Sequence, residues 1–140
     1  MRAARLLALA TLLVSGCDVL EPGPADRLPG RYRMVTYGGR PLPAVVRGQA
    51  GMDRVELVSA EMELRRNFRW VQTSRADSIA GGTRHSVVQV DSGVFGFHDR
   101  GPDVGLMFTT RDGKLHHAAT RADTLDVLWS ADGRHDLFVR

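Results

Sequence analysis

Five histidines are the strongest candidates in this 140-residue sequence for binding a metal ion, since neutral imidazole is a common metal ligand. His116 and His117 are adjacent, and adjacent side chains on a β-strand point to opposite faces, so these two cannot chelate one ion together. His85, His98 and His135 are far apart in the sequence, and no His-x-His or Glu-x-x-His spacing occurs. The sequence therefore predicts no metal site and no cofactor.

Glu61 and Glu63 have the spacing of a catalytic carboxylate pair. Two residues apart on a strand, they would share one face at a separation of roughly 7 Å. Met62 and Leu64 alternate with them, which favours a solvated outer face for the glutamates. No serine has the flanking glycines of a nucleophile elbow, and no glycine-rich phosphate-binding loop occurs. We therefore expect a protein that is not an enzyme.

The single cysteine, Cys17, excludes an internal disulfide and follows a segment with the layout of a secretory signal. Residues 1–16 contain two arginines, then an apolar run too short to span a bilayer, then small residues. The five residues Leu13 to Cys17 resemble the lipobox of bacterial lipoproteins. The resemblance implies that Cys17 carries a lipid and that residues 1–16 are a signal peptide removed before it. A short transmembrane anchor, or an ordinary signal with a chance cysteine, is the alternative.

An attached lipid would hold the protein on a membrane of the bacterial cell envelope, with its domain outside the cytoplasm. Several acyl chains make such an attachment effectively permanent, whereas one chain holds a protein only marginally. Asp18 resembles an inner-membrane retention signal of enteric bacteria. That rule does not transfer between bacterial groups, so the inner and the outer membrane both stay open.

The charge balance argues against a nucleic-acid partner. The whole chain has a formal charge of +3 and a pI near 9.7. Without Arg2 and Arg5, which lie in the predicted signal peptide, seventeen basic residues face sixteen acidic ones. A net charge of about +1 lacks the excess of basic residues that binding to a phosphate backbone requires.

The chain after the signal peptide divides into two parts. Residues 17–29 contain three prolines and alternating charges, which is typical of an extended tether. Residues 30–140 form a single domain in this interpretation. Its first segment, Gly30 to Pro43, reads as a strand that alternates apolar and basic residues and closes with a reversal at Gly38 and Gly39.

The rest of the domain continues this alternation. The pattern slips once near Val58, as it would at a β-bulge. Turns are expected at Arg65 to Asn67, with Asn67 left-handed, and at Arg111 to Lys114, whereas Asp77 to Thr83 reads as a longer loop. From His85 to Phe97 the alternation is expected to pass through Val88, Val90, Gly93, Phe95 and Phe97. The glycines Gly93 and Gly96 suggest a bend in this strand. About eight strands result, which predicts an all-β, antiparallel up-and-down meander closing into a small barrel.

Several short motifs resemble the small lipocalin-like lipoproteins of bacteria. They are Gly30 to Pro43, Ser92 to Phe95, Asp112 to Leu115 and Asp123 to Val127. The resemblance implies a calycin-type barrel and says more about fold than about activity. One departure is the Asn67-Phe68 pair, where the family commonly has Asp-Gly before an aromatic strand, and this puts the type of that turn in doubt.

Large apolar residues at inward positions of the predicted barrel either line a ligand pocket or fill the interior. These residues are Tyr32, Met34, Trp70, Phe95, Phe97, Phe108 and Trp129. An eight-stranded barrel can be packed solid or can hold one small ligand. We expect a membrane-anchored lipoprotein that binds a small hydrophobic molecule or an envelope lipid. The alternative is an interaction lipoprotein with a solid core, which would act as an envelope-assembly factor or an inhibitor of a hydrolase.

Overall fold

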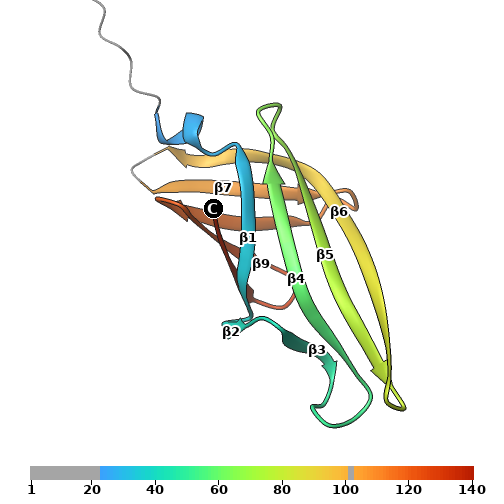
Figure 1. The fold of residues 1–140 in the computed structure, drawn as a ribbon. Coiled ribbons are helices and arrows are strands. Elements are labelled where there is room, and N and C mark those ends of the chain that lie inside the picture. Colours follow the sequence, from blue (N-terminus) through green and yellow to red (C-terminus); the bar gives the residue numbers. More distant parts are fainter. Residues whose placement is uncertain (1–22, 101–102) are drawn as a thin grey trace, which may run out of the picture.

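The computed structural model describes residues 23–100 and 103–140, and in these residues the only helix is the single 3-10 turn η1 (Pro24–Arg27). No helix there is long and apolar enough to cross a membrane. The rest is built from strands (Figure 1). They are β1 (Gly30–Tyr37), β2 (Arg40–Pro41), β3 (Ala44–Gly48), β4 (Arg54–Leu64), β5 (Arg69–Ala80), β6 (Thr83–Arg100), β7 (Val104–Thr110), β8 (Leu115–Arg121), β9 (Thr124–Trp129) and β10 (Arg134–Val139).

Eight of these strands close into an antiparallel barrel. Strands β4 to β10 pair in chain order, β10 pairs with β1, and β1 pairs with β4. The predicted all-β, up-and-down barrel is therefore confirmed. Closure removes the two edges that an open meander would expose to solvent.

The seam between β1 and β4 is closed at one end only. Gly30 to Arg33 of β1 pair with Glu61 to Leu64 of β4. Beyond Arg33, β1 pairs with β10 and β2, while the first part of β4 pairs with the short strand β3. Figure 1 shows β1 and β4 diverging from this seam. The barrel thus has a closed end, near the start of β1, and an open end, near β2 and β3.

The long hairpin of β5 and β6 extends the wall of the barrel at the open end (Figure 1). Strand β7 pairs with β6 only from Gly93 to Arg100, so the first half of β6 pairs with β5 alone. The hairpin ends in a tight turn at Gly81 and Gly82, which have φ angles of 55° and 80°. The longer loop predicted for Asp77 to Thr83 is therefore wrong, because strand pairing continues to Ala80 and Thr83.

The structure confirms the predicted bulge in β4 and corrects the predicted turn after it. The register shifts between Leu57 and Ser59, so the bulge expected near Val58 is confirmed. In the turn after β4, however, the residue with positive φ is Phe68, at 60°, and not Asn67. The side chain of Asn67 instead accepts a hydrogen bond from the backbone N–H of Arg69 at 3.3 Å. Phe68 packs its ring on two aromatic residues of β6, which compensates for the unfavourable backbone conformation.

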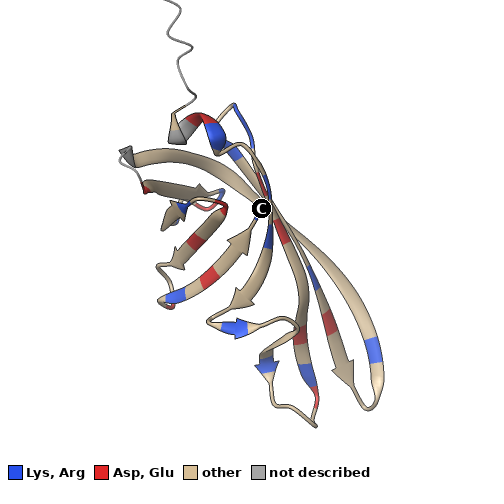
Figure 2. Cartoon of the chain, turned by 60° about the vertical axis from the view of Figure 1, so that its left-hand side comes forward, with Lys and Arg blue, Asp and Glu red and all other residues tan. Residues whose placement is uncertain are grey.

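Apolar side chains fill the closed half of the barrel. Trp70, Phe108 and Phe138 are its largest fully buried members. The rings of Trp70 and Phe108 meet edge to face at 5.8 Å. Leu28, from the segment before β1, packs into the same core, and its carbonyl oxygen accepts a hydrogen bond from the Tyr32 hydroxyl at 2.8 Å. Charges of both signs are interspersed along the strands (Figure 2).

Candidate ligand-binding site

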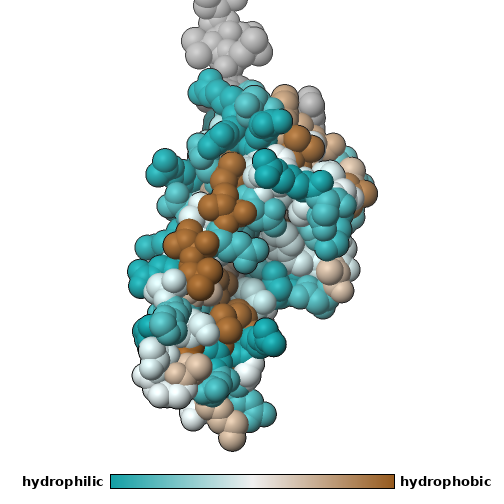
Figure 3. Space-filling view, turned by 90° about the vertical axis from the view of Figure 1, so that its right-hand side faces the viewer, coloured by the Kyte–Doolittle hydropathy of each residue, from teal (hydrophilic) through white to brown (hydrophobic). Residues whose placement is uncertain are grey.

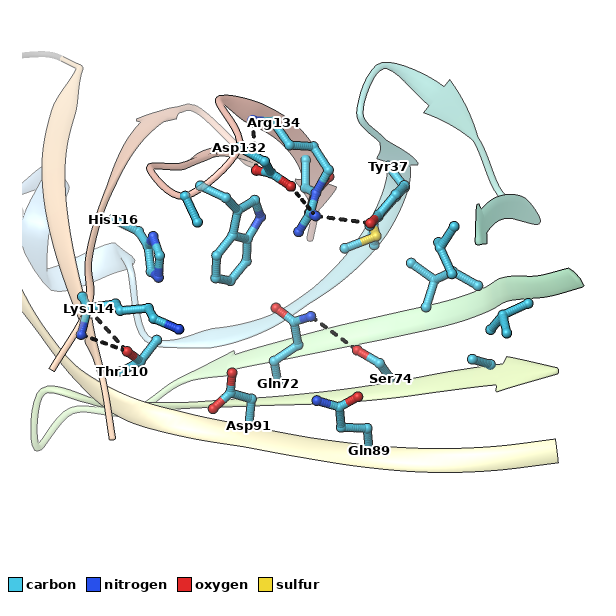
Figure 4. Close-up of a pocket in the computed structure, with 18 of the residues that line it drawn as sticks. Tyr37, Gln72, Ser74, Gln89, Asp91, Thr110, Lys114, His116, Asp132 and Arg134 are labelled. Carbon is cyan, nitrogen blue, oxygen red and sulfur yellow. Dashed lines mark hydrogen bonds and ion pairs between the residues drawn. The ribbon is translucent and has the colours of Figure 1, made fainter. Parts of the chain in front are cut away.

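The open half of the barrel contains a hollow of about 450 Å³. All eight barrel strands and β3 contribute side chains to its wall, because each strand presents every second residue to the interior. Figure 4 shows these side chains converging from opposite sides of the barrel. The hollow lies where the seam between β1 and β4 has opened and where β6 has no pairing with β7.

One side of the hollow is apolar. Strands β3 to β6 supply Val46, Val55, Leu57, Ala76 and Val87 to this side. Leu57 is buried, whereas the side chains of Val46 and Val87 are exposed at the rim. This apolar wall could contact the hydrocarbon part of a small ligand.

The opposite side is organised around Arg134 of β10. Its Nε–H donates to both carboxylate oxygens of Asp136, and its Nη1 donates to the Tyr37 hydroxyl at 2.9 Å and to Asp132 at 3.0 Å. The guanidinium also stacks on the Tyr37 ring, 4.2 Å from its centroid. Asp136 accepts a further hydrogen bond from the backbone N–H of Gly38. Figure 4 shows the Arg134 contacts to Tyr37 and Asp132. This side of the site is therefore fixed before any ligand arrives.

His116 of β8 is a neutral member of the wall. Its Nδ1 accepts a hydrogen bond from the backbone N–H of Ser130 at 3.2 Å, so the proton of the neutral ring is on Nε2. Burial lowers the pKa of His116, and Lys114 and Arg134 lower it further, while Asp112 and Asp91 act in the opposite direction. The ring lies 4.8 Å from that of Trp129. His116 is thus a neutral ring at neutral pH, with its hydrogen-bond donor at Nε2.

Two polar atoms in the wall are buried without a hydrogen-bond partner among the described residues: Oε1 of Gln72 and Nε1 of Trp129. The amide nitrogen of Gln72 donates to Ser74 at 3.1 Å, which leaves its oxygen as an unused acceptor. A buried polar group without a partner costs about 1–3 kcal/mol. A bound molecule that supplied a donor would remove the penalty at Gln72, and one that supplied an acceptor would remove the penalty at Trp129.

The wall carries more acidic than basic residues. Lys114 lies 2.8 Å from Asp112, which helps to lower the pKa of Asp112 to about 2. Arg134 is paired with Asp132 and Asp136. The remaining carboxylate is that of Asp91 on β6, which accepts a hydrogen bond from the backbone N–H of Ser92 but forms no salt bridge within the described part of the chain.

The residues predicted from the sequence as pocket or core lining divide between the two halves of the barrel. Met34 and Trp129 line the hollow, and they also join the packed core, Met34 as a buried member and Trp129 packed against it. The others lie in or against the packed core: Tyr32, Trp70, Phe95 and Phe108 are buried there, and Phe97 is partly buried against it.

Gln89 and Asp91 of the hollow were missed because the alternation expected for residues 85–97 placed Val88 and Val90 on the inner face in their stead. Val88 and Val90 are 63% exposed, so their predicted inward position is wrong. Pairing with β5 runs from Thr83 to Val94 without a register shift, which keeps Gln89 and Asp91 on the same face as Phe95. Counting back in steps of two from Phe95 would have found them.

Two of the histidines considered for chemistry come together, since the rings of His98 and His117 meet edge to face with centroids 6.2 Å apart. His116 is buried and His117 is exposed, which confirms their opposite faces. Glu61 pairs with Arg31 at 3.7 Å, and Glu63 pairs with Arg65 at 3.0 Å, on the outer face as predicted. Across residues 23–100 and 103–140, no three His, Cys, Asp or Glu side chains are grouped to hold a metal ion.

Comparisons with known proteins assign no family to the chain. No family model, curated protein or solved structure matches it. Cys17 and the predicted signal peptide, residues 1–16, lie outside the described residues. The interpretation of the hollow therefore depends on its own side chains.

Proposed function

We propose that the protein is a lipid-anchored, non-enzymatic binding protein of the bacterial cell envelope that holds a small, partly hydrophobic molecule in the open end of its barrel. The hollow of about 450 Å³ is the observation that carries this proposal. It has the size of a small-molecule site, and it combines an apolar wall with a few fixed polar groups. The apolar part of the ligand would contact Val55, Leu57 and Val87.

Two features support binding over catalysis. The Nδ1 of His116 accepts from the backbone N–H of Ser130, and the Ser130 hydroxyl, 3.1 Å from the same nitrogen, donates to the carbonyl oxygen of Leu115 instead. Ser74 is the only serine in the wall among the described residues, and its hydroxyl accepts a hydrogen bond from Gln72. In this arrangement neither Ser130 nor Ser74 is a nucleophile with a free base to take its proton.

A competing proposal, from the class of interaction proteins, would assign the function to the outer surface. Figure 3 shows a band of apolar side chains on the face that carries β6, where Val88, Val90 and Val94 are exposed. The band is narrow, and β5 places Arg75, Thr73 and Arg69 directly beside these three valines. We favour the hollow because it contains buried polar groups without partners, whereas nothing in the valine band calls for a specific contact.

The pocket is tested by two single substitutions on β5. Ser74 lines the hollow and Thr73 points outward, so Ser74→Trp should fill the site and Thr73→Trp should leave it open. We expect the neutral apolar dye N-phenyl-1-naphthylamine to bind the wild type and Thr73→Trp with increased fluorescence, and to bind Ser74→Trp at least tenfold more weakly. Equal dye binding by both variants, with circular dichroism showing that both are folded, would contradict the proposed pocket.

The lipid anchor is tested separately. Cells that express the protein are grown with a radioactive fatty acid, and the labelled protein is recovered from the membrane fraction. We expect label on the wild type and none on Cys17→Ala. Label that persists in Cys17→Ala would exclude attachment through this thiol.

A further inference from the structure

We propose that the ligand of this pocket is an organic cation, a protonated amine with an apolar body, and that Asp91 binds its ammonium group. The inference rests on the proposed function, because it names the chemical class of the ligand in the same hollow. Three features of the hollow favour such a ligand: the charge of its wall, the pairing of Gln72 with Asp91, and the apolar wall beside them.

The charge of the wall favours a cation. Four aspartates line the hollow against one lysine and one arginine, and His116 is held neutral by burial. The two basic groups already have close carboxylate partners, at 2.8 Å for Lys114 and 3.0 Å for Arg134. Asp91 is left as the carboxylate without a salt bridge among the described residues of the wall. A cationic ligand would pair with it, whereas an anionic ligand would add a further negative charge to an already acidic site.

The position of Gln72 makes the site suitable for an amine. Gln72 of β5 and Asp91 of β6 are directly opposite each other in the strand pairing, so their side chains share the inner face. Figure 4 shows both projecting from their strands toward the middle of the hollow. Oε1 of Gln72 is the buried acceptor that lacks a donor. An ammonium group carries three N–H donors and no acceptor, so it could serve Asp91 and Gln72 at the same time.

The apolar wall begins beside these two acceptors. On β6, Asp91 and Gln89 are followed toward the open end by Val87, and on β4 Leu57 and Val55 line the same side. An alkyl or aromatic body joined to the ammonium group could therefore lie along this wall. A small inorganic cation would leave this wall unused.

Isothermal titration calorimetry of the full chain at pH 7 with octylamine, octanol and octanoate tests the proposal. These probes share an alkyl body and differ in the charge of the head group. We expect octylamine to bind the wild type at least tenfold more tightly than octanol or octanoate. Asp91→Asn should weaken octylamine binding at least tenfold and leave octanol binding within twofold. The control Asp126→Asn removes a carboxylate that pairs with His135 outside the barrel, and it should leave octylamine binding within twofold.

A second variant keeps the test independent of how well Asp91→Asn folds. Gln72→Glu adds a carboxylate opposite Asp91 and should tighten octylamine binding severalfold. If octanol binds the wild type as tightly as octylamine, and neither substitution changes the order, the ligand is not a cation but the pocket stands. If no probe binds, and the naphthylamine dye does not bind either, the proposed function fails and this inference fails with it.

Discussion

The Nε–H of Arg134 donates to both carboxylate oxygens of Asp136, at 3.0 and 3.1 Å, and the Asp136 side chain is fully buried. The two residues are on the same face of β10, two positions apart. Together with Tyr37 and Gly38 of the neighbouring strand and turn, they tie β10 to the end of β1. The open end of the barrel is therefore held together by polar contacts, in contrast to the apolar packing of the closed end.

Removing one partner of this pair should cost stability. Asp136→Ala leaves the guanidinium of Arg134 and the N–H of Gly38 without their buried acceptor, and we expect the free energy of unfolding to fall by about 3 kcal/mol. Urea denaturation followed by circular dichroism measures the change. Asp126→Ala removes an exposed carboxylate paired with His135 and should cost less than about 1 kcal/mol. If both variants lost the same free energy of unfolding, the buried pair of Arg134 and Asp136 would stabilise the protein no more than an exposed pair.

Two glycines of β6 should respond differently to the same substitution. A Cβ on Gly93 would overlap the carbonyl oxygen of Thr109 and lie 2.9 Å from Nε1 of Trp70, whereas a Cβ on Gly96 meets no atom within 4 Å. Gly93→Ala should therefore destabilise the protein by about 2 kcal/mol or more. Gly96→Ala should be neutral or slightly stabilising, because alanine restricts the unfolded chain. Thermal unfolding of both variants checks this, and an equally stable Gly93→Ala would refute the close approach of β7.

Two leucines that differ in burial test the packed core of the closed half. Leu125 is fully buried in the closed half, and Leu115 is 50% exposed at the start of β8. Leu125→Ala should lower the free energy of unfolding by about 3 kcal/mol, since it leaves a cavity in packed surroundings. Leu115→Ala should cost less than about 1 kcal/mol. Chemical denaturation of the two variants would contradict the packed core if their midpoints moved equally.

His116 should make the protein less stable in mild acid. Burial lowers the pKa of His116 below its ordinary value of 6.5, so the unfolded chain binds a proton at a higher pH than the folded protein does. The contribution of this residue is fully present above pH 6.5 and is lost as the pH falls through the folded pKa. In His116→Asn the side-chain oxygen can still accept from Ser130 but cannot titrate. The difference between the two unfolding curves should therefore change with pH below 6.5 and be flat above it.

The alternation of residues predicted the barrel because burial on one face of a strand leaves a period of two in the sequence. That period located β1, the bulge at Val58 and the reversal at Gly38 and Gly39. It also placed Trp129, which lines the hollow, among the inward residues. These features depend on a few neighbouring residues and their immediate strand partners.

The polar half of the site is harder to place from the alternation, because counting back from Phe95 is valid only if β6 continues through Gly93 without a register shift. Gln89 and Asp91 point inward, but polar residues on the inner face of an open barrel have the same pattern as polar residues on an outer face. The difference is set by the seam, where β1 leaves β4 after Arg33, and this pairing joins segments far apart in the sequence. The left-handed conformation of Phe68 was not predicted for a related reason. Its ring contacts with Phe95 and Phe97 outweigh the preference of phenylalanine for a negative φ.

The segment Gly23 to Pro29 covers the end of the barrel that is opposite the hollow. Arg140 binds the carbonyl oxygens of Arg27, Leu28 and Pro29, and Leu28 is buried beneath them. With the lipid that we propose on Cys17, the chain would enter the domain at the end of the barrel opposite the hollow. The proposed point of attachment and the mouth of the barrel would then be at opposite ends of the domain, so the anchor would not block the mouth.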